Sequence, residues 1–368
     1  MTSNPRVVFA ERPAYGELPA VGKHLIFDSS PTIDLDNVPL NGGFLTKTLI
    51  LSPEPAMRER MRDPSSVSYT TTFVVGAPLI GFGIVVVLRS EKDDVKAGEY
   101  MYGMTPWEAY TVQPYVEGRV EFKSEEWAPE TFDMDSLALR VVPSLKDAGL
   151  PLTTHASILG TPGLTAFVGF EGLVEAKAGS TIFVSSGASG VGSMVIQLAK
   201  LKGMKVIASA GSDAKVEYMR SLGADFPFNY KKQSYESALA QHGPINVFWD
   251  NVGGEVLDAA LVALVPRSRA IICGVIAIDN APPTERYRLK NTDLILKKRL
   301  ELRGFIVPDL IPQFIGRFVV EVPMLVAQGK LRSVECVTEG IENAPQALID
   351  TLKGREAPGK PVVVVAKE

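Results

Sequence analysis

The chain has 368 residues, which is too many for one compact core and enough for two domains. Hydrophobic residues make up 46% and charged residues 22%, as in an ordinary soluble globular enzyme, and the formal net charge of −4 offers no basic face for nucleic acid or an anionic membrane. The two cysteines exclude a disulfide framework and a four-cysteine zinc site, and the three scattered histidines have no metal-ligand spacing.

The first 150 residues are rich in Pro, Gly, Val and short alternating runs, and they predict an irregular, mostly β domain. From about residue 151 to 307 the pattern changes to alternating strands and helices. The strand candidates are residues 181–185, 205–210, 226–230, 245–249, 269–276 and 300–307. Six strands with crossover helices predict an α/β domain of the Rossmann type, with a doubly wound parallel sheet. Residues 311–330 then predict an amphipathic helix, and residues 361–366 a closing strand.

No charged-then-apolar leader opens the chain. The apolar runs at 84–88 and 362–366 are the size of strands and far short of a membrane span. We therefore expect a cytoplasmic protein in a reducing compartment, without a membrane or nucleic-acid partner.

A glycine-rich turn follows the first strand of the second domain. Gly187, Gly190 and Gly192 stand between the strand 181–185 and a helix over 191–202. A helix that begins at such a turn directs free N–H groups and a partial positive charge forward, which suits a pyrophosphate. The spacing is G-x-x-G-x-G, whereas the usual dinucleotide fingerprint is G-x-G-x-x-G. An ordinary tight βα turn without a ligand is therefore the alternative.

The end of the second strand, 205–210, bears on which nicotinamide coenzyme binds. Asp213 lies at about the distance at which a carboxylate holds the ribose of NAD, but it falls beyond the strand, where Ser212 or Asp213 would cap the next helix. Gly211 leaves room for a phosphate, and Lys215 in the first helical turn could neutralise it. The alternative for Lys215 is a solvated surface lysine. We favour NADPH.

Seven short motifs, in order along the chain, carry a family resemblance. They are LSPEPAMR at 51–58, GTPGLTA at 160–166, GSDAK at 211–215, FNYK at 228–231, DNVGG at 250–254, CG at 273–274 and GFIV at 304–307. With them the chain resembles the medium-chain dehydrogenase/reductase superfamily. The likeness is to its zinc-free branch of leukotriene B4 12-hydroxydehydrogenases, prostaglandin reductases and alkenal double-bond reductases.

This resemblance implies a GroES-like catalytic domain from residues 1–150 and 308–368, a Rossmann NADP-binding domain from 151–307, and a homodimer. It implies that NADPH is bound by residues that follow the strands of the parallel sheet. These residues are Ser189, Gly190, Val191 and Gly192 at the pyrophosphate, Gly211, Ser212 and Lys215 at the 2′-phosphate, Tyr230 at the adenosine, and Asn251, Cys273, Gly274, Phe305, Ile306 and Val307 toward the nicotinamide. Considered without the resemblance, Tyr230 is more typical of a strand end and Asn251 of a turn.

Several positions depart from the pattern of the family. Its members commonly carry a tyrosine where this chain has Ala56, Phe82 and Asp279, and an Asn-x-Gly-Lys where residues 356–360 read EAPGK. We expect the first three residues to line an altered substrate pocket, and we do not expect the C-terminal amide contact to the coenzyme.

Tyr69 and Tyr287 are the candidates for proton donors in the pocket, with Tyr69 as the candidate catalytic residue. The alternative for each is a packed or surface tyrosine. The reaction implied by the resemblance is reduction of a carbon–carbon double bond conjugated to a carbonyl, by hydride transfer to the β-carbon and protonation of the α-carbon. Two alternatives remain: an NADPH quinone reductase of the same superfamily, and a non-catalytic NADPH-binding protein.

Overall fold

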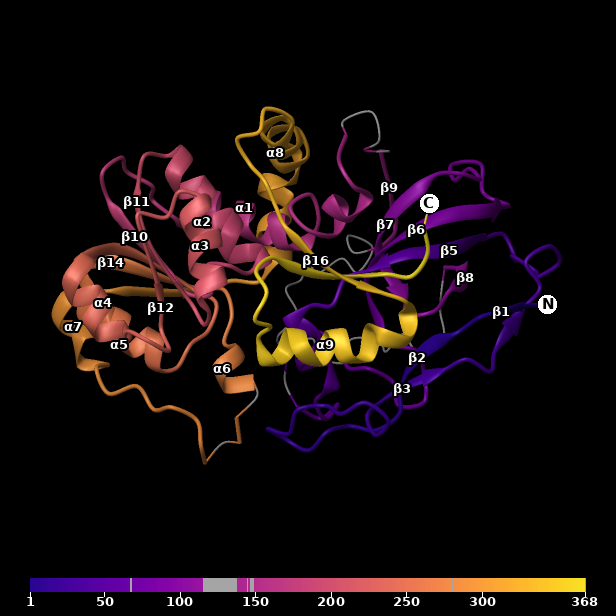
Figure 1. The fold of residues 1–368 in the computed structure, drawn as a ribbon, viewed down its shortest axis with the longest axis horizontal. Helices are drawn as coiled ribbons and strands as arrows, with labels where there is room; N and C mark the ends of the chain where they lie inside the picture. Colours follow the sequence, from indigo (N-terminus) through magenta and orange to yellow (C-terminus); the bar gives the residue numbers. More distant parts are fainter. Residues whose placement is uncertain are drawn as a thin grey trace. The chain divides into compact units, whose positions relative to one another are not determined.

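The structure is a computed structural model that describes residues 1–66, 68–114, 138–143, 145, 149–279, 281–282 and 284–367. The chain forms two compact units (Figure 1). The first unit comprises Met1–Ala156, Glu335–Gly354 and Pro361–Glu368, and the second comprises Ser157–Val334 and Arg355–Lys360.

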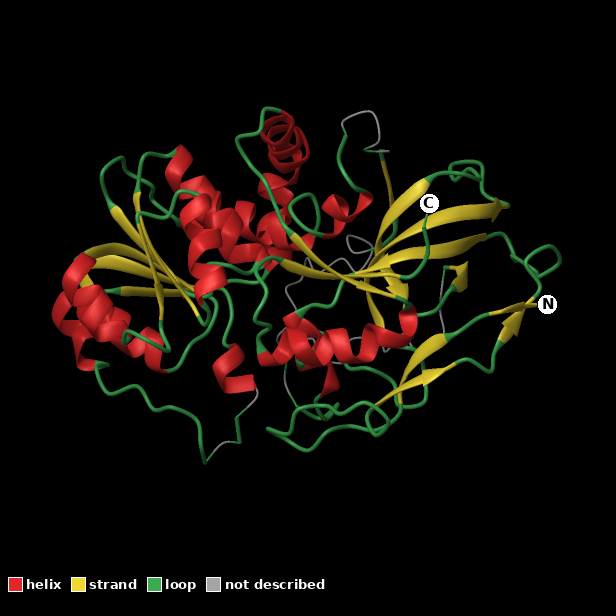
Figure 2. Cartoon of the chain, viewed as in Figure 1, coloured by secondary structure: helices red, strands yellow, loops and turns green. Residues whose placement is uncertain are grey.

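The first unit is mostly β (Figure 2). Its described strands form a seven-stranded sheet in the order β16-β17-β5-β6-β7-β9, with β8 also paired to β5. The strands of this sheet are β5 Phe44–Leu51, β6 Ile80–Ser90, β7 Tyr100–Pro106, β8 Tyr110–Gln113, β9 Arg140–Val142, β16 Glu335–Glu339 and β17 Lys360–Val364. Two small antiparallel pairs join β1 Thr2–Ser3 with β4 Thr32–Ile33, and β2 Arg6–Phe9 with β3 Leu25–Asp28.

One α-helix and four short 3-10 helices complete the described part of the first unit. They are α9 Ala344–Lys353, η1 Pro55–Met57, η2 Glu59–Met61, η5 Leu152–Ala156 and η6 Ile341–Asn343. The apolar face of α9, with Leu348 and Leu352, packs in one core cluster with Leu51 and with Met57 and Met61 of the 3-10 turns. Burial of this face fixes the segment after β5, which contains Ala56.

The second unit contains six parallel strands in the order β12-β11-β10-β13-β14-β15. The strands are β10 Thr181–Val184, β11 Lys205–Ala210, β12 Phe226–Asn229, β13 Ile245–Asp250, β14 Leu264–Ile272 and β15 Glu301–Gly304. This order, with the crossovers on either side of β10, is that of a doubly wound sheet. The predicted α/β fold class, a mostly β unit plus a Rossmann-like parallel sheet, is confirmed.

Helices cover both faces of this sheet (Figure 2). The helices of this unit are α1 Thr161–Leu173, α2 Gly190–Leu201, α3 Asp213–Ser221, α4 Tyr235–His242, α5 Glu255–Ala263, α6 Ile276–Asp279, α7 Asp293–Lys298 and α8 Val307–Ala327, and all except α6 contribute to the core clusters on its faces. Ile182 and Val184 of β10 pack with α1, α2 and α8, whereas Phe183 packs on the opposite face with α4 and α5. The alternation follows from the two-residue period of a strand, and both faces of the strand are buried.

The compact units differ from the boundaries expected at residues 150 and 308. The second unit begins at Ser157, extends through α8 to Val334, and also takes in residues 355–360. The reason is packing, because Phe314 and Phe318 of α8 lie in the same core cluster as Phe167 of α1. By length and composition alone, α8 could cross a membrane, but its buried side chains belong to this core, and a core helix passes the same test.

Three predicted elements need correction. The strand expected over 269–276 spans Leu264–Ile272 and is followed by the helical turn α6. The strand expected over 300–307 ends at Gly304, since Ile306 is the N-cap of α8. The helix α8 therefore begins four residues earlier than the amphipathic pattern indicated, with Pro308 in its first turn, where a proline is tolerated.

Candidate functional site

The predicted coenzyme residues all follow the carboxyl ends of the parallel strands. The arrangement is Ser189–Gly192 after β10, Gly211, Ser212 and Lys215 after β11, Tyr230 after β12, Asn251 after β13, Cys273 and Gly274 after β14, and Phe305–Val307 after β15. Because all six strands are parallel, these residues share one edge of the sheet. Ligands of doubly wound sheets bind at this edge, near the point where the strand order reverses.

The glycine-rich turn is shaped by close contacts within the second unit. Its left-handed residue is Ser186, with φ of 50°, and the glycines themselves do not have positive φ. A Cβ on Gly192 would collide with the carbonyl oxygen of Ser186, and one on Gly187 would lie 2.7 Å from the sulfur of Met219 in α3. Gly187 and Gly192 are therefore required to pack the turn against its neighbours.

The N-terminus of α2 offers hydrogen-bond donors. Ser189 is the N-cap, and its hydroxyl accepts from Gly192 N at 3.1 Å. Within the described part of the chain, the N–H groups of Gly190 and Val191 have no hydrogen-bond partner. Two free amides at the positive end of a twelve-residue helix fit a pyrophosphate.

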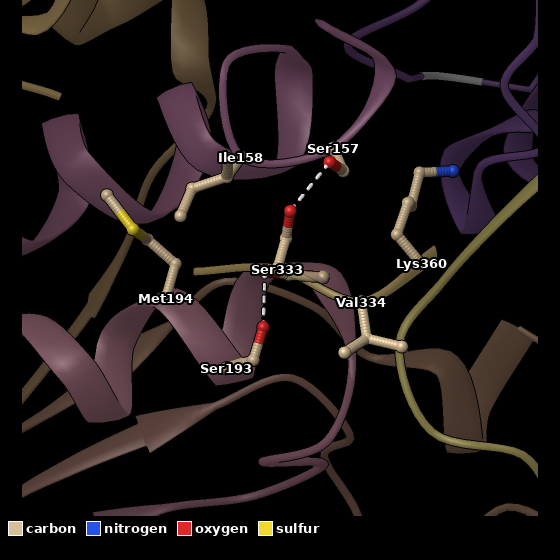
Figure 3. A pocket seen from close by; sticks show the side chains of 8 residues that line it. Ser157, Ile158, Ser193, Met194, Ser333, Val334 and Lys360 are labelled. Atoms are coloured by element: carbon tan, nitrogen blue, oxygen red, sulfur yellow. Dashed lines mark hydrogen bonds between the residues drawn. The ribbon is translucent and has the colours of Figure 1, made fainter. Parts of the chain in front are cut away.

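A small pocket lies behind this turn (Figure 3). It is lined by Ser157, Ile158, Gly190, Ser193, Met194, Ser333, Val334 and Lys360, and the hydroxyls of Ser157 and Ser333 are 3.1 Å apart. Of the predicted coenzyme residues only Gly190 lines it, so this pocket is a packing feature of the turn and not the coenzyme groove.

The end of β11 carries the residues that the sequence predicted for the 2′-phosphate. Ser212 is the N-cap of α3 and accepts from Lys215 N at 3.4 Å, which places Lys215 in the first helical turn. Tyr230 N donates to Ala210 O at 3.1 Å. The Tyr230 hydroxyl lies over Gly211, where it would be 2.9 Å from an added Cβ. The phenol of Tyr230 and the backbone of Gly211 are thus in contact across the ends of β12 and β11, and Lys215 follows in the first turn of α3.

Asp213, the alternative carboxylate for NAD, is held by other partners. It is the first residue of α3, where it accepts from Asn229 Nδ2 at 2.9 Å and from Lys232 Nζ. These bonds, with Lys232 contributing most, lower the pKa of Asp213. A ribose hydroxyl would have to compete with both partners for this carboxylate.

A buried polar network connects the ends of β10 and β13. The Ser185 hydroxyl donates to Asp250 Oδ1 at 3.0 Å and accepts from Asn251 N at 2.8 Å. Asn251 Nδ2 donates to Ser185 O at 2.6 Å, and Trp249 Nε1 donates to Asn251 Oδ1 at 3.1 Å. The side chain of Asn251 is therefore fixed in orientation by both of its polar atoms.

Sequence reasoning missed Ser185 and Asp250, both fully buried. Asp250 Oδ1 also accepts from Val252 N and Gly253 N, while Oδ2 is buried and without a hydrogen-bond partner among the residues described. Burial raises the pKa of Asp250 to about 6 against these bonds. The sequence does contain a signal for this pair. Ser185 and Asp250 each stand at the end of an apolar strand, and polar side chains buried there need hydrogen-bond partners.

The remaining coenzyme candidates lie beside this network. Cys273 N and Gly274 N both donate to Asp250 O, at 2.8 and 3.1 Å. Burial raises the pKa of the Cys273 thiol to about 12, which disfavours the thiolate form. The ring of Phe305 packs edge-on against Trp249 with centroids 5.9 Å apart. The side chain of Phe305 is thus packed against the core.

Three predicted pocket residues lie in the first unit, around the start of β6. Phe82, in β6, stacks on Tyr102 with centroids 5.6 Å apart. Ser52 N donates to Phe82 O at 2.9 Å, which ties β6 to the segment that carries Ala56. Ala56 is exposed in its 3-10 turn, and Tyr69 is 41% exposed.

Three arginines hold the loop that carries Tyr69. Arg12 donates to Arg62 O at 2.6 Å and to Phe73 O at 2.9 Å, at the two ends of the loop. Arg60 donates to Thr71 O at 3.3 Å, and Arg62 donates to Thr70 O. Charge-assisted bonds to backbone carbonyls fix this loop, whose described residues between Arg62 and Ala77 form no helix or strand. Arg62 also interacts electrostatically with Tyr69.

The other two pocket candidates, Asp279 and Tyr287, lie in the second unit. Asp279 ends α6. The Tyr287 hydroxyl donates to Asp258 Oδ2 at 3.1 Å, and Asp258 also accepts from Lys290 N and Asn291 N. The proton of Tyr287 is therefore committed to a carboxylate. Over the described ranges, no group of three His, Cys, Asp or Glu side chains is placed to hold a metal ion.

Comparison with known proteins decides the family. Residues 34–118 match the family model described as the N-terminal domain of oxidoreductase, and residues 190–319 match that of zinc-binding dehydrogenase. The chain is 36% identical over 328 residues, 88% of each sequence, to 2-alkenal reductase (NADP(+)-dependent) of Nicotiana tabacum. The chain belongs to the medium-chain dehydrogenase/reductase superfamily. The predicted resemblance is confirmed.

Two further members of the superfamily support this assignment. Prostaglandin reductase 1 of Rattus norvegicus is 31% identical over 333 residues, 88% of this chain and 90% of that protein. The crystal structure of CurA in complex with NADPH from Vibrio vulnificus has a TM-score of 0.82 at 28% identity, and the alignment covers 99% of this chain and 100% of that one. The protein is therefore an oxidoreductase in the alkenal reductase branch of the superfamily.

Proposed function

We propose that the protein uses NADPH to reduce the carbon–carbon double bond of α,β-unsaturated ketones and aldehydes. The observation that supports it best is the end of β11, where α3 has Lys215 in its first turn, Tyr230 lies against Gly211, and Asp213 is bound to Asn229 and Lys232. The names of the tobacco 2-alkenal reductase and of the CurA–NADPH structure agree with this choice of coenzyme and substrate class.

The residues present fit this coenzyme at three places along the sheet edge. The free amides of Gly190 and Val191 would bind the pyrophosphate. Lys215 and Tyr230 would hold the 2′-phosphate and the adenosine. The backbone after β13 and β14 would face the nicotinamide, and the Ser185–Asp250–Asn251 network keeps that backbone in place.

When bound, NADPH supplies a hydride to the β-carbon of the substrate. The chain would contribute binding, orientation and a hydrogen-bond donor at the carbonyl, where negative charge develops. Tyr69 is our candidate for the proton that reaches the α-carbon. Its loop is held by arginines, and the positive charge of Arg62 near the phenol would stabilise the phenolate that remains. Tyr287 is less suited, because its proton is already donated to Asp258.

The test is consumption of NADPH by the purified protein with a panel of short conjugated ketones, aldehydes and quinones, with and without a chelator. We expect turnover with enones and enals that the chelator does not abolish. Faster turnover with quinones than with enones would replace the proposal by a quinone reductase. Tight NADPH binding without turnover of any substrate would replace it by a non-catalytic NADPH-binding protein.

A further inference from the structure

A short segment near the C-terminus lies against the candidate 2′-phosphate site. This segment, residues 355–360, is here called the C-terminal strap, and it belongs to the second unit. Gly359 N donates to Ala188 O of the glycine-rich turn at 3.1 Å. The Ser212 hydroxyl donates to Glu356 O at 2.9 Å, across 144 residues of chain. The strap therefore places Glu356 next to the N-cap of α3.

The carboxylate of Glu356 faces a lysine from the neighbouring strand end. Lys231 Nζ lies 3.6 Å from Glu356 Oε1, and the two side chains are 57% and 81% exposed. Lys231 directly follows Tyr230, whose hydroxyl stands over Gly211. An acidic and a basic side chain thus lie at the same strand ends as Lys215.

Both effects of the Glu356–Lys231 pair weaken the binding of a 2′-phosphate. The Glu356 carboxylate repels a phosphate through a like charge, and it engages Lys231, which would otherwise attract the phosphate. Neither effect applies to a ribose without the phosphate. We propose that Glu356 is a specificity-determining residue that limits the preference of this site for a 2′-phosphorylated coenzyme. The proposal rests on the proposed use of NADPH.

The direct test compares Glu356→Gln with the native protein in titrations with NADPH and NADH, followed by calorimetry. We expect the dissociation constant for NADPH to fall about two- to fivefold, the size of an interaction between exposed charges, and that for NADH to stay unchanged. Glu175→Gln is the matched control. Glu175 is 70% exposed and paired with Arg269, which lies away from the α3 N-cap, so its loss should change neither constant.

A second variant tests the role of the lysine. If Glu356 acts partly by engaging Lys231, the gain from Glu356→Gln should be smaller in a Lys231→Gln background. The gain should also shrink between low and high salt, because both side chains are exposed.

An unchanged ratio of NADPH to NADH affinity in Glu356→Gln would overturn the inference while leaving the proposed function intact. Failure of the native protein to bind NADPH would instead overturn the proposed function itself.

Discussion

Gly211 and Tyr230 are matched to each other across two neighbouring strands. A Cβ at Gly211 would lie 2.9 Å from the hydroxyl of Tyr230, and Tyr230 N is bonded to the carbonyl of the residue before Gly211. The bare backbone of one strand end therefore makes room for the ring at the next. This pairing forms one side of the proposed 2′-phosphate site.

Replacement of Gly211 by alanine tests this pairing. The backbone at this position does not have positive φ, so alanine is tolerated there, but the new methyl group displaces the Tyr230 hydroxyl. We expect the dissociation constant for NADPH to rise about three- to tenfold, with less than about 1 kcal/mol lost from the free energy of unfolding. Adding Tyr230→Phe relieves the contact and should recover part of the affinity. An unaltered affinity in Gly211→Ala would remove this strand end from the site.

We propose that the choice of coenzyme depends on Lys215. Because its charge would act on the 2′-phosphate alone, Lys215→Ala should weaken NADPH binding by about 1 to 2 kcal/mol and NADH binding far less. Lys205→Ala is the control, since Lys205 is an exposed lysine at the opposite end of β11. Dissociation constants of both variants for NADPH and NADH, measured at one salt concentration, show whether Lys215 acts on the 2′-phosphate. Equal losses for NADPH and NADH would mean that Lys215 acts on the helix and not on a phosphate.

The sequence predicted the parallel sheet because its central strands, such as β10 and β13, are short and mostly apolar runs bounded by polar turns. The common edge of the predicted coenzyme residues followed from this, since residues that come after parallel strands lie at the same edge of the sheet. The N-cap at Ser212 was predicted with Asp213 as the alternative, and the structure decides for Ser212. These features depend on local pattern, which one sequence contains in full.

The features that sequence reasoning missed depend on contacts between distant residues. The left-handed conformation of Ser186 and the contact between Ser212 and Glu356 have no local signature. The sequence did not predict the early start of α8 because Pro308 is typical of a helix break. In the structure Pro308 lies in the first turn of α8. The assignment of α8 to the second unit comes from packing against α1, which no periodicity reveals.

The buried carboxyl of Asp250 predicts a pH dependence of stability. Burial raises its pKa from 3.8 to about 6. A raised pKa means that the folded state holds the proton more tightly than the unfolded state does. The resulting stability is complete below the unfolded pKa and is lost as the pH rises toward about 6, by roughly 3 kcal/mol at most.

Asp250→Asn removes this titration while keeping the Oδ1 acceptor. We expect the variant to be at least as stable as the native protein at about pH 8, and its stability to vary less between about pH 4 and pH 6, by urea unfolding. Asp258→Asn is the control, because the pKa of Asp258 is shifted in the opposite direction. Burial raises the pKa of Asp258, but hydrogen bonds from Asn291, Lys290 and Tyr287 outweigh it and lower the pKa. Loss of Asp258 should therefore cost stability at neutral pH and less in acid. A destabilised Asp250→Asn at every pH would contradict the assignment for Asp250.

Arg60 is a buried cation that stabilises the first unit through backbone carbonyls. Its guanidinium donates to Thr71 O and Ile80 O and stacks over Phe73 at 4.3 Å, and burial lowers its pKa to about 10, so it stays charged at neutral pH. A lysine cannot reproduce this planar fork. We expect Arg60→Lys to lower the free energy of unfolding by about 2 to 4 kcal/mol. The same change at the exposed Arg317 should cost less than about 1 kcal/mol, and equal losses would show that the fork at Arg60 has no special role.

For the two tyrosines predicted as proton donors, Tyr69 and Tyr287, we expect different effects of substitution on kcat. Tyr69 is exposed on a loop held by arginines, whereas the Tyr287 hydroxyl donates to Asp258. Tyr69→Phe should lower kcat with a conjugated ketone by about 10- to 100-fold without changing the dissociation constant for NADPH, because only the proton transfer is lost. Tyr287→Phe should change kcat less than about threefold. Steady-state kinetics of both variants, with NADPH binding measured separately, distinguish a proton donor from a residue that shapes the pocket. If Tyr69→Phe retains full kcat, the proton comes from another group, and Tyr69 is only part of the surface of the first unit.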